Sequence, residues 1–142
     1  MKNRYVSRNA AETFALGKKM GESLKDGDII ALHGSLGAGK TVLAKGIACG
    51  LGIEEQIVSP TYTLLKEYCG GRLALYHFDL YRIEEEEELW HIGFYDYLGA
   101  DGVCIIEWAE KASDLPCCVC VSFEGSGSDL RIINIQGMEG SA

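Results

Sequence analysis

The chain has 142 residues, a formal net charge of −8 and 47% hydrophobic residues, so we expect one domain with a buried core over residues 1–142. The negative charge argues against extensive direct binding of nucleic acid, because phosphate backbones are bound by basic surfaces. No apolar run approaches the roughly 20 residues that cross a bilayer, and no apolar segment follows the basic N-terminus. We therefore expect a cytoplasmic protein that does not bind membranes.

The first third of the chain alternates helix and strand. Residues 9–25 carry apolar side chains at near-helical spacing, and Asn9 with Glu12 has the form of a capping box. Residues 29–32 are a short apolar run, which is typical of a buried strand. A glycine-rich segment follows, and the pattern then predicts a second helix over residues 41–51.

The rest of the chain adds strands around a short helical region. A glycine turn joins two predicted strands, and an acidic helix and a shorter helix come next. Three more apolar runs predict strands in the last third. In chain order these elements are residues 63–68, 73–78, 84–90, 94–98, 103–106, 119–123 and 130–135. The pattern predicts a mixed α/β domain with a mostly parallel centre and added antiparallel strands.

Six cysteines are present, and Cys104, Cys118 and Cys120 lie in apolar strand-like runs. Buried free thiols are the simplest interpretation of that placement. Residues 117–120 have a C-x-x-C spacing, but the sequence has no second such pair, and a structural zinc site usually takes four ligands. We expect neither a metal nor a redox role for these cysteines.

Residues 34–41 read Gly-Ser-Leu-Gly-Ala-Gly-Lys-Thr, which matches G-x-x-x-x-G-K-[ST] between a predicted strand and a predicted helix. In such a loop the glycines let consecutive backbone N–H groups point at phosphate oxygens, and the helix adds its positive N-terminus. Lys40 would bring a charge to the β- and γ-phosphates, and Thr41 would place a hydroxyl on Mg²⁺. We predict that ATP is bound by Leu36, Gly37, Ala38, Gly39, Lys40 and Thr41.

Two acidic residues follow predicted strands, where a P-loop protein needs a group that holds Mg²⁺ and orients a water. Asp79 comes after residues 75–78, and Glu107 comes after residues 103–106. Ligands gather at the carboxyl ends of strands in open α/β sheets. A water-orienting role suits Glu107 and a metal-ligand role suits Asp79, although the sequence permits the reverse and either carboxylate could simply cap a turn.

Three further features have both structural and functional interpretations. The segment 59–63 carries hydroxyls that could sense the γ-phosphate, or it is an ordinary turn. Strand alternation puts His77 on the same face as Asp79, which fits a shared site, yet a lone histidine is often structural. The glutamates at 84–88 form a solvated helix face or, alternatively, a docking surface for a basic partner.

Taken together, these motifs resemble the TsaE (YjeE) family. The resemblance rests on the P-loop at 34–41, Ser-Pro-Thr-Tyr-Thr at 59–63, His-Phe-Asp-Leu-Tyr-Arg at 77–82, the segment from Glu88 to Gly93, and Ile-Glu-Trp at 106–108. It runs from about residue 7 to residue 110. The resemblance implies the three-layer sandwich of P-loop NTPases.

The TsaE family consists of small bacterial P-loop ATPases needed to make N6-threonylcarbamoyladenosine at position 37 of tRNAs that read codons beginning with A. The resemblance implies that the chain works with the TsaD and TsaB proteins, which transfer the threonylcarbamoyl group, and meets tRNA only through that complex. It implies that ATP hydrolysis resets the complex between turnovers. The implied catalytic residues are Glu107, Lys40 and Thr61, and the implied Mg²⁺ ligands are Thr41, Asp79 and Glu107.

The chain departs from the family pattern at Ser35, where an acidic residue is common, and at Val42, where a second threonine is common. Neither position supplies an essential ligand in a P-loop. Three other functions stay open: a small-molecule kinase, a GTPase switch and a nucleotide-gated binding module. The chain has only five arginines for a kinase lid, and it lacks the Asn-Lys-x-Asp element that usually selects guanine.

Overall fold

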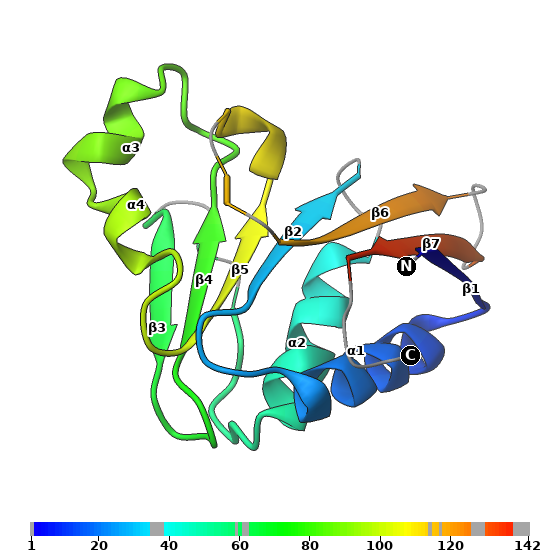
Figure 1. Cartoon of the computed structure of the whole chain (residues 1–142). Coiled ribbons are helices and arrows are strands. Elements are labelled where there is room, and N and C mark those ends of the chain that lie inside the picture. The colour runs from blue at the N-terminus through cyan, green and yellow to red at the C-terminus, as the bar shows by residue number, and fades with distance from the viewer. Residues whose placement is uncertain are drawn as a thin grey trace.

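The chain folds around a seven-stranded sheet, in which the strands lie side by side in the order β1-β7-β6-β2-β5-β4-β3 (Figure 1). The computed structural model describes residues 2–34, 39–58, 60, 63–113, 115–116, 118–125 and 130–137. The strands are β1 (Lys2–Ser7), β2 (Ile29–His33), β3 (Leu65–Tyr68), β4 (Leu75–Asp79), β5 (Val103–Glu107), β6 (Val119–Gly125) and β7 (Arg131–Gln136).

The centre of the sheet is parallel and its margins are antiparallel. β6, β2, β5 and β4 pair in parallel, whereas β7, β1 and β3 join them in antiparallel register. The carboxyl ends of β2, β4, β5 and β6 therefore meet at one edge of the sheet. This arrangement confirms the predicted α/β class with a parallel centre and antiparallel additions.

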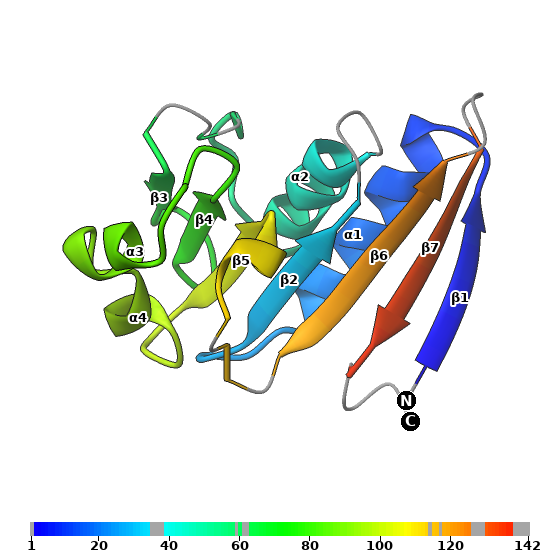
Figure 2. The ribbon, with the colours of Figure 1, turned by 90° about the horizontal axis from the view of Figure 1, so that it is seen from above.

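Helices cover both faces of the sheet (Figure 2). On one face lie α1 (Ala10–Ser23) and α2 (Lys40–Gly50), which pack with alternate strand residues such as Ile30 and Ile105 into one buried cluster. The other face has α3 (Glu87–His91), α4 (Phe94–Tyr97) and the 3₁₀ turn η1 (Ala109–Lys111), which bury the intervening strand residues in a second cluster. None of the helices in the described ranges is long and apolar enough to cross a membrane.

The helices α1 and α2 touch backbone to backbone through glycines. α1 presents Gly17 and Gly21, one turn apart, and α2 presents Gly46 and Gly50 in the same way. A Cβ placed on Gly46 would lie 2.3 Å from the Phe14 carbonyl oxygen, and one on Gly21 would lie 2.2 Å from the Ile47 carbonyl oxygen. This close contact lets α1 brace the helix that begins at the predicted P-loop.

The structure also changes details of the predicted elements. The strand β1 was not predicted, and the acidic helix begins at Glu87, because Glu88 instead accepts hydrogen bonds from the backbone N–H groups of Glu84 and Glu85. The capping box forms in modified form: Asn9 accepts from the Glu12 N–H, while the Glu12 carboxylate accepts from the N–H of Arg8.

Candidate nucleotide site

The N-terminus of α2 follows the central strand β2, and Lys40 is its first residue. Gly39 has a φ of 99°, a left-handed conformation that glycine adopts without a steric penalty. The Lys40 side chain is 4% exposed, and its Nζ donates a hydrogen bond of 2.9 Å to the carbonyl oxygen of Gly34. The ammonium thus points back toward Gly34, the residue that follows β2.

Trp108 brings the end of β5 to the same place. The Lys40 Nζ lies 4.2 Å from the centroid of the Trp108 ring, a cation–π contact. Trp108 has a φ of 57°, which is rare for a bulky residue and turns the chain sharply after Glu107. Such strained residues cluster at functional sites, where the surrounding structure holds them. The Tyr81 ring packs on Trp108 with centroids 4.9 Å apart.

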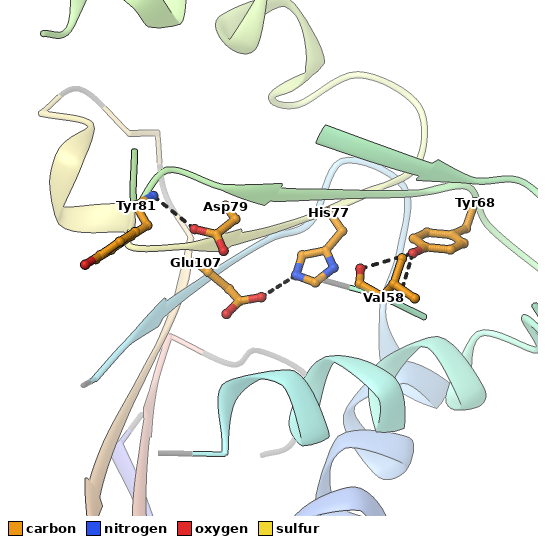
Figure 3. Close-up of polar contacts among 6 residues, drawn as sticks. All are labelled: Val58, Tyr68, His77, Asp79, Tyr81 and Glu107. Carbon is orange, nitrogen blue, oxygen red and sulfur yellow. Dashed lines mark hydrogen bonds and ion pairs between the residues drawn. The ribbon is translucent and has the colours of Figure 1, made fainter. Parts of the chain in front are cut away.

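The two acidic residues predicted from the strand ends lie side by side. Asp79 and Glu107 are Cα partners at the ends of the parallel strands β4 and β5, and each is 4% exposed. Asp79 Oδ1 accepts a hydrogen bond of 2.9 Å from the Tyr81 N–H, so this carboxylate also stabilises the turn after β4 (Figure 3). Asp79 therefore has the turn-capping role that the sequence left open, and it also lies at the end of β4 opposite Glu107, where it could bind a metal ion.

Glu107 is tied to His77, a contact that the sequence did not predict. The Nε2 atom of His77 lies 2.6 Å from Glu107 Oε2 (Figure 3), and His77 is fully buried. Strand alternation had placed His77 and Asp79 on one face, and that is where both lie. The missing information was the register of β4 against β5, which sets Glu107 opposite Asp79 and within reach of His77.

The predicted site residues divide into two groups. Gly39, Lys40, Thr41, Asp79 and Glu107 are described, and they come from the carboxyl edge of the sheet and the N-terminus of α2. The other four lie outside the described residues: Leu36, Gly37, Ala38 and Thr61. The roles of both groups stay predictions.

The oxygen groups at the candidate site are suitable ligands for an Mg²⁺ ion that binds together with a nucleotide. No three His, Cys, Asp or Glu side chains in the described ranges gather into a metal-ion site. Mg²⁺ needs no such cluster, because it is usually held by one or two carboxylates together with phosphate oxygens and waters. The buried pair Asp79 and Glu107 offers two carboxylates, and Thr41 offers a hydroxyl one residue after Lys40.

The glutamates before α3 have structural contacts of their own. The Glu86 carboxylate accepts hydrogen bonds from the Ser113 N–H and hydroxyl and from the Tyr95 hydroxyl. The Ser113 hydroxyl and N–H lower the pKa of Glu86, and the N–H groups of Glu84 and Glu85 lower that of Glu88. Part of the acidic run therefore fastens the α3 region, which neither interpretation of the sequence foresaw.

The cysteines that the structure describes carry thiols, as predicted, but among Cys104, Cys118 and Cys120 the predicted burial holds for Cys104 alone. Cys104 is buried, Cys118 and Cys120 are half-buried, and Cys49 and Cys69 are exposed. Burial raises the pKa of Cys104 to about 12, so its thiol stays protonated and unreactive at neutral pH.

The chain is similar to known proteins over most of its length. The model of a family described as "Threonylcarbamoyl adenosine biosynthesis protein TsaE" matches residues 7–133. A protein of Treponema pallidum named tRNA threonylcarbamoyladenosine biosynthesis protein TsaE is 49% identical over 114 residues, which make up 80% of this chain and 84% of the relative.

A sequence and a solved structure from Bacillus subtilis are also similar to this chain. A protein with the same name as the Treponema relative is 48% identical over 101 residues, which make up 71% of this chain but only 63% of the relative. The crystal structure of B. subtilis YdiB superposes with a TM-score of 0.81 at 37% identity, covering 95% of this chain and 84% of that chain. The fold is thus that of the P-loop NTPase-like α/β sandwiches. The chain belongs to the TsaE family.

Proposed function

We propose that this chain is a Mg²⁺-dependent ATP hydrolase that serves the threonylcarbamoyl modification of adenosine 37 in tRNAs reading codons that begin with A. One observation carries the hydrolase: the buried Lys40 at the start of α2 contacts Trp108, directly beside the paired carboxylates of Asp79 and Glu107. A cation for phosphate and acids for metal and water thus lie at one sheet edge.

Each residue has a role that its chemistry suits. Lys40 would give its ammonium to the β- and γ-phosphates, which are stronger acceptors than the Gly34 carbonyl that it contacts. Glu107 would orient a water, and Asp79 and Thr41 would hold Mg²⁺. Thr61, together with the backbone of Leu36, Gly37, Ala38 and Gly39, would complete the site. Mg²⁺ held there would neutralise the charge that develops on the phosphate oxygens.

The proposed partners are the TsaD and TsaB proteins, with the chain acting in the cytoplasm. The relatives' names support the pathway, because they refer to tRNA threonylcarbamoyladenosine biosynthesis. The net charge of −8 supports an indirect link to tRNA through such a complex. ATP hydrolysis would then reset the complex between turnovers.

A reconstituted reaction tests the proposal. We expect slow hydrolysis of Mg-ATP by the chain alone, faster hydrolysis with TsaD and TsaB, and repeated tRNA modification only when the chain is present. The Glu107→Gln variant should still bind ATP. It should hydrolyse ATP at least about 100-fold more slowly than the wild type, the usual loss for a missing acid–base group. Modification over many turnovers that is indifferent to this chain would refute the pathway.

The same assay separates the remaining alternatives. If the Glu107→Gln variant supported repeated modification without hydrolysis, the chain would be a nucleotide-gated binding module. Transfer of labelled γ-phosphate to a nucleoside or sugar instead of water would indicate a kinase, and tighter binding of GTP than ATP would indicate a GTPase switch.

A further inference from the structure

The pair formed by His77 and Glu107 is among the most deeply buried polar contacts in the described part of the chain. His77 is 0% exposed and Glu107 is 4% exposed, and the His77 Nε2 lies 2.6 Å from Glu107 Oε2. The other ring nitrogen of His77, Nδ1, is buried and has no hydrogen-bond partner among the residues described. One ring nitrogen of the imidazole is therefore bonded to Glu107, and the other has no polar contact within the described part of the chain.

His77 lies on a mostly apolar face of the sheet. The ring lies on the sheet face that packs against α2, in the same face position along β4 as Leu75. Beyond the ring, Figure 3 shows the Tyr68 hydroxyl paired with the Val58 backbone: it accepts from the Val58 N–H at 3.1 Å and donates to the Val58 carbonyl oxygen at 3.4 Å.

This asymmetry identifies the tautomer of His77. If Nε2 carries the proton, it donates to an ionised Glu107, and Nδ1 is only an unfilled acceptor. If Nδ1 carries the proton instead, a buried N–H is left without an acceptor, which is rarer and more costly. The tautomer with its proton on Nε2 is therefore favoured.

We infer that His77 is a positioning residue, which holds the Glu107 carboxylate by Oε2 so that Oε1 is the oxygen presented to water or Mg²⁺. The inference rests on the proposed function for the role of Glu107. A buried carboxylate on a strand end can adopt several rotamers, and one short hydrogen bond from a rigid, enclosed ring selects among them. Partners of this kind around a metal or catalytic group typically change affinity or activity 10- to 100-fold.

Two substitutions of His77 separate positioning from simple burial. A glutamine amide nitrogen can reach the place of the imidazole Nε2, whereas an asparagine amide nitrogen is one methylene shorter and reaches only the place of Nδ1. We expect His77→Asn to lower kcat for ATP hydrolysis about 10- to 100-fold, with His77→Gln within about threefold of the wild type. The affinity for the nucleotide itself should change little, because Lys40 and the loop are untouched.

Leu75→Val is the matched control, since Leu75 is fully buried on the same strand and face but has no polar contact with Glu107. It should lower stability without lowering kcat. In the Glu107→Gln background, His77→Asn should cause no further loss of kcat. Equal kcat for the Asn and Gln variants, or a full additional loss in the double variant, would overturn the inference.

The tautomer gives a readout that needs neither nucleotide nor partner. Nitrogen-detected NMR correlations of the ring in the free protein should show the His77 proton on Nε2. A proton on Nδ1 would refute the proposed geometry even if the His77 variants failed to fold. If the wild type did not hydrolyse ATP under any condition, the proposed function would fail, whereas the tautomer would still decide whether His77 holds Glu107.

Discussion

At the scale of single residues, Lys40 is the buried positive charge of the candidate site. Its ammonium is removed from solvent and, among the described residues, contacts one carbonyl oxygen and one aromatic ring. Burying a charge with so few partners is costly, so a phosphate group that offers several anionic oxygens would be bound strongly. The burial of Lys40 therefore favours the binding of a polyanion over a purely structural role.

Replacing Lys40 with alanine tests this conclusion. We expect ATP to bind roughly 30- to 150-fold more weakly, because one charge-assisted interaction contributes about 2–3 kcal/mol. Fluorescence titration with a labelled ATP analogue in the presence of Mg²⁺ would measure the change. Lys45→Ala is the control, since Lys45 lies exposed on the same helix. If both variants bound ATP as tightly as the wild type, Lys40 would have no role in phosphate binding.

At the scale of secondary-structure elements, the packing of α1 against α2 opposes helix propensity. Alanine is favoured over glycine in a helix interior by about 1 kcal/mol, so propensity alone predicts that Gly46→Ala stabilises the protein. The structure predicts the opposite sign, because the new Cβ would meet the Phe14 carbonyl oxygen at 2.3 Å. Backbone atoms cannot yield as a flexible side chain can.

We expect Gly46→Ala to lower the free energy of unfolding by about 1–3 kcal/mol, the usual cost of overpacking. Urea unfolding followed by circular dichroism would measure it. Gly70→Ala provides the comparison, because a Cβ at Gly70 would meet no atom within 4 Å. A more stable Gly46→Ala protein would show that the two helices can move apart without cost.

The hydrogen bonds of Glu86 fasten the segment before α3 to Ser113, near η1, and they depend on pH. The Ser113 hydroxyl and N–H lower the pKa of Glu86 from its usual 4.5. A lowered carboxyl pKa stabilises the folded form above the ordinary value, and this stabilisation is lost as pH falls through the lower, folded value. The contact should thus persist at neutral pH and break only below about pH 4.5.

Proton NMR of the Ser113 N–H during acid titration would follow this contact. We expect its resonance to move with a midpoint below 4.5, and to be insensitive to pH in that range in a Glu86→Gln variant. A Glu124→Gln variant is the control, because Glu124 is exposed on β6, on a different part of the sheet. A midpoint at or above the usual glutamate value would show that Ser113 does not hold the carboxylate.

The sequence predicted the elements whose signals are local. Strands β2 and β5 are unbroken apolar runs, so these two strands were predicted close to their observed bounds. The strand β1 was missed because its residues are mostly polar or exposed, and it exists through antiparallel pairing with β7, at the far end of the sequence. The bond between His77 and Glu107 was missed for the same reason, since it depends on strand register.

At the scale of the whole molecule, the charge and the site point to different partners. The net charge of −8 disfavours contact with the phosphate backbone of tRNA, whereas the proposed nucleotide site would attract a small polyanion that carries its own Mg²⁺. We therefore propose that a protein of this charge that serves tRNA modification meets the tRNA through a second protein. Binding to that partner, and not to the nucleic acid, is where ATP would exert control.

The expectation is therefore that the chain alone binds tRNA no more tightly than ordinary non-specific contacts, about 10⁻⁴–10⁻⁶ M at physiological salt. Fluorescence anisotropy with labelled tRNA would measure this, with and without Mg-ATP. TsaD and TsaB should retain the chain in a pull-down, more strongly with ATP than without it, and Lys40→Ala should abolish the nucleotide effect. Tight tRNA binding by the isolated chain would mean that a local surface overrides the net charge, and the partner would then be unnecessary for recognition.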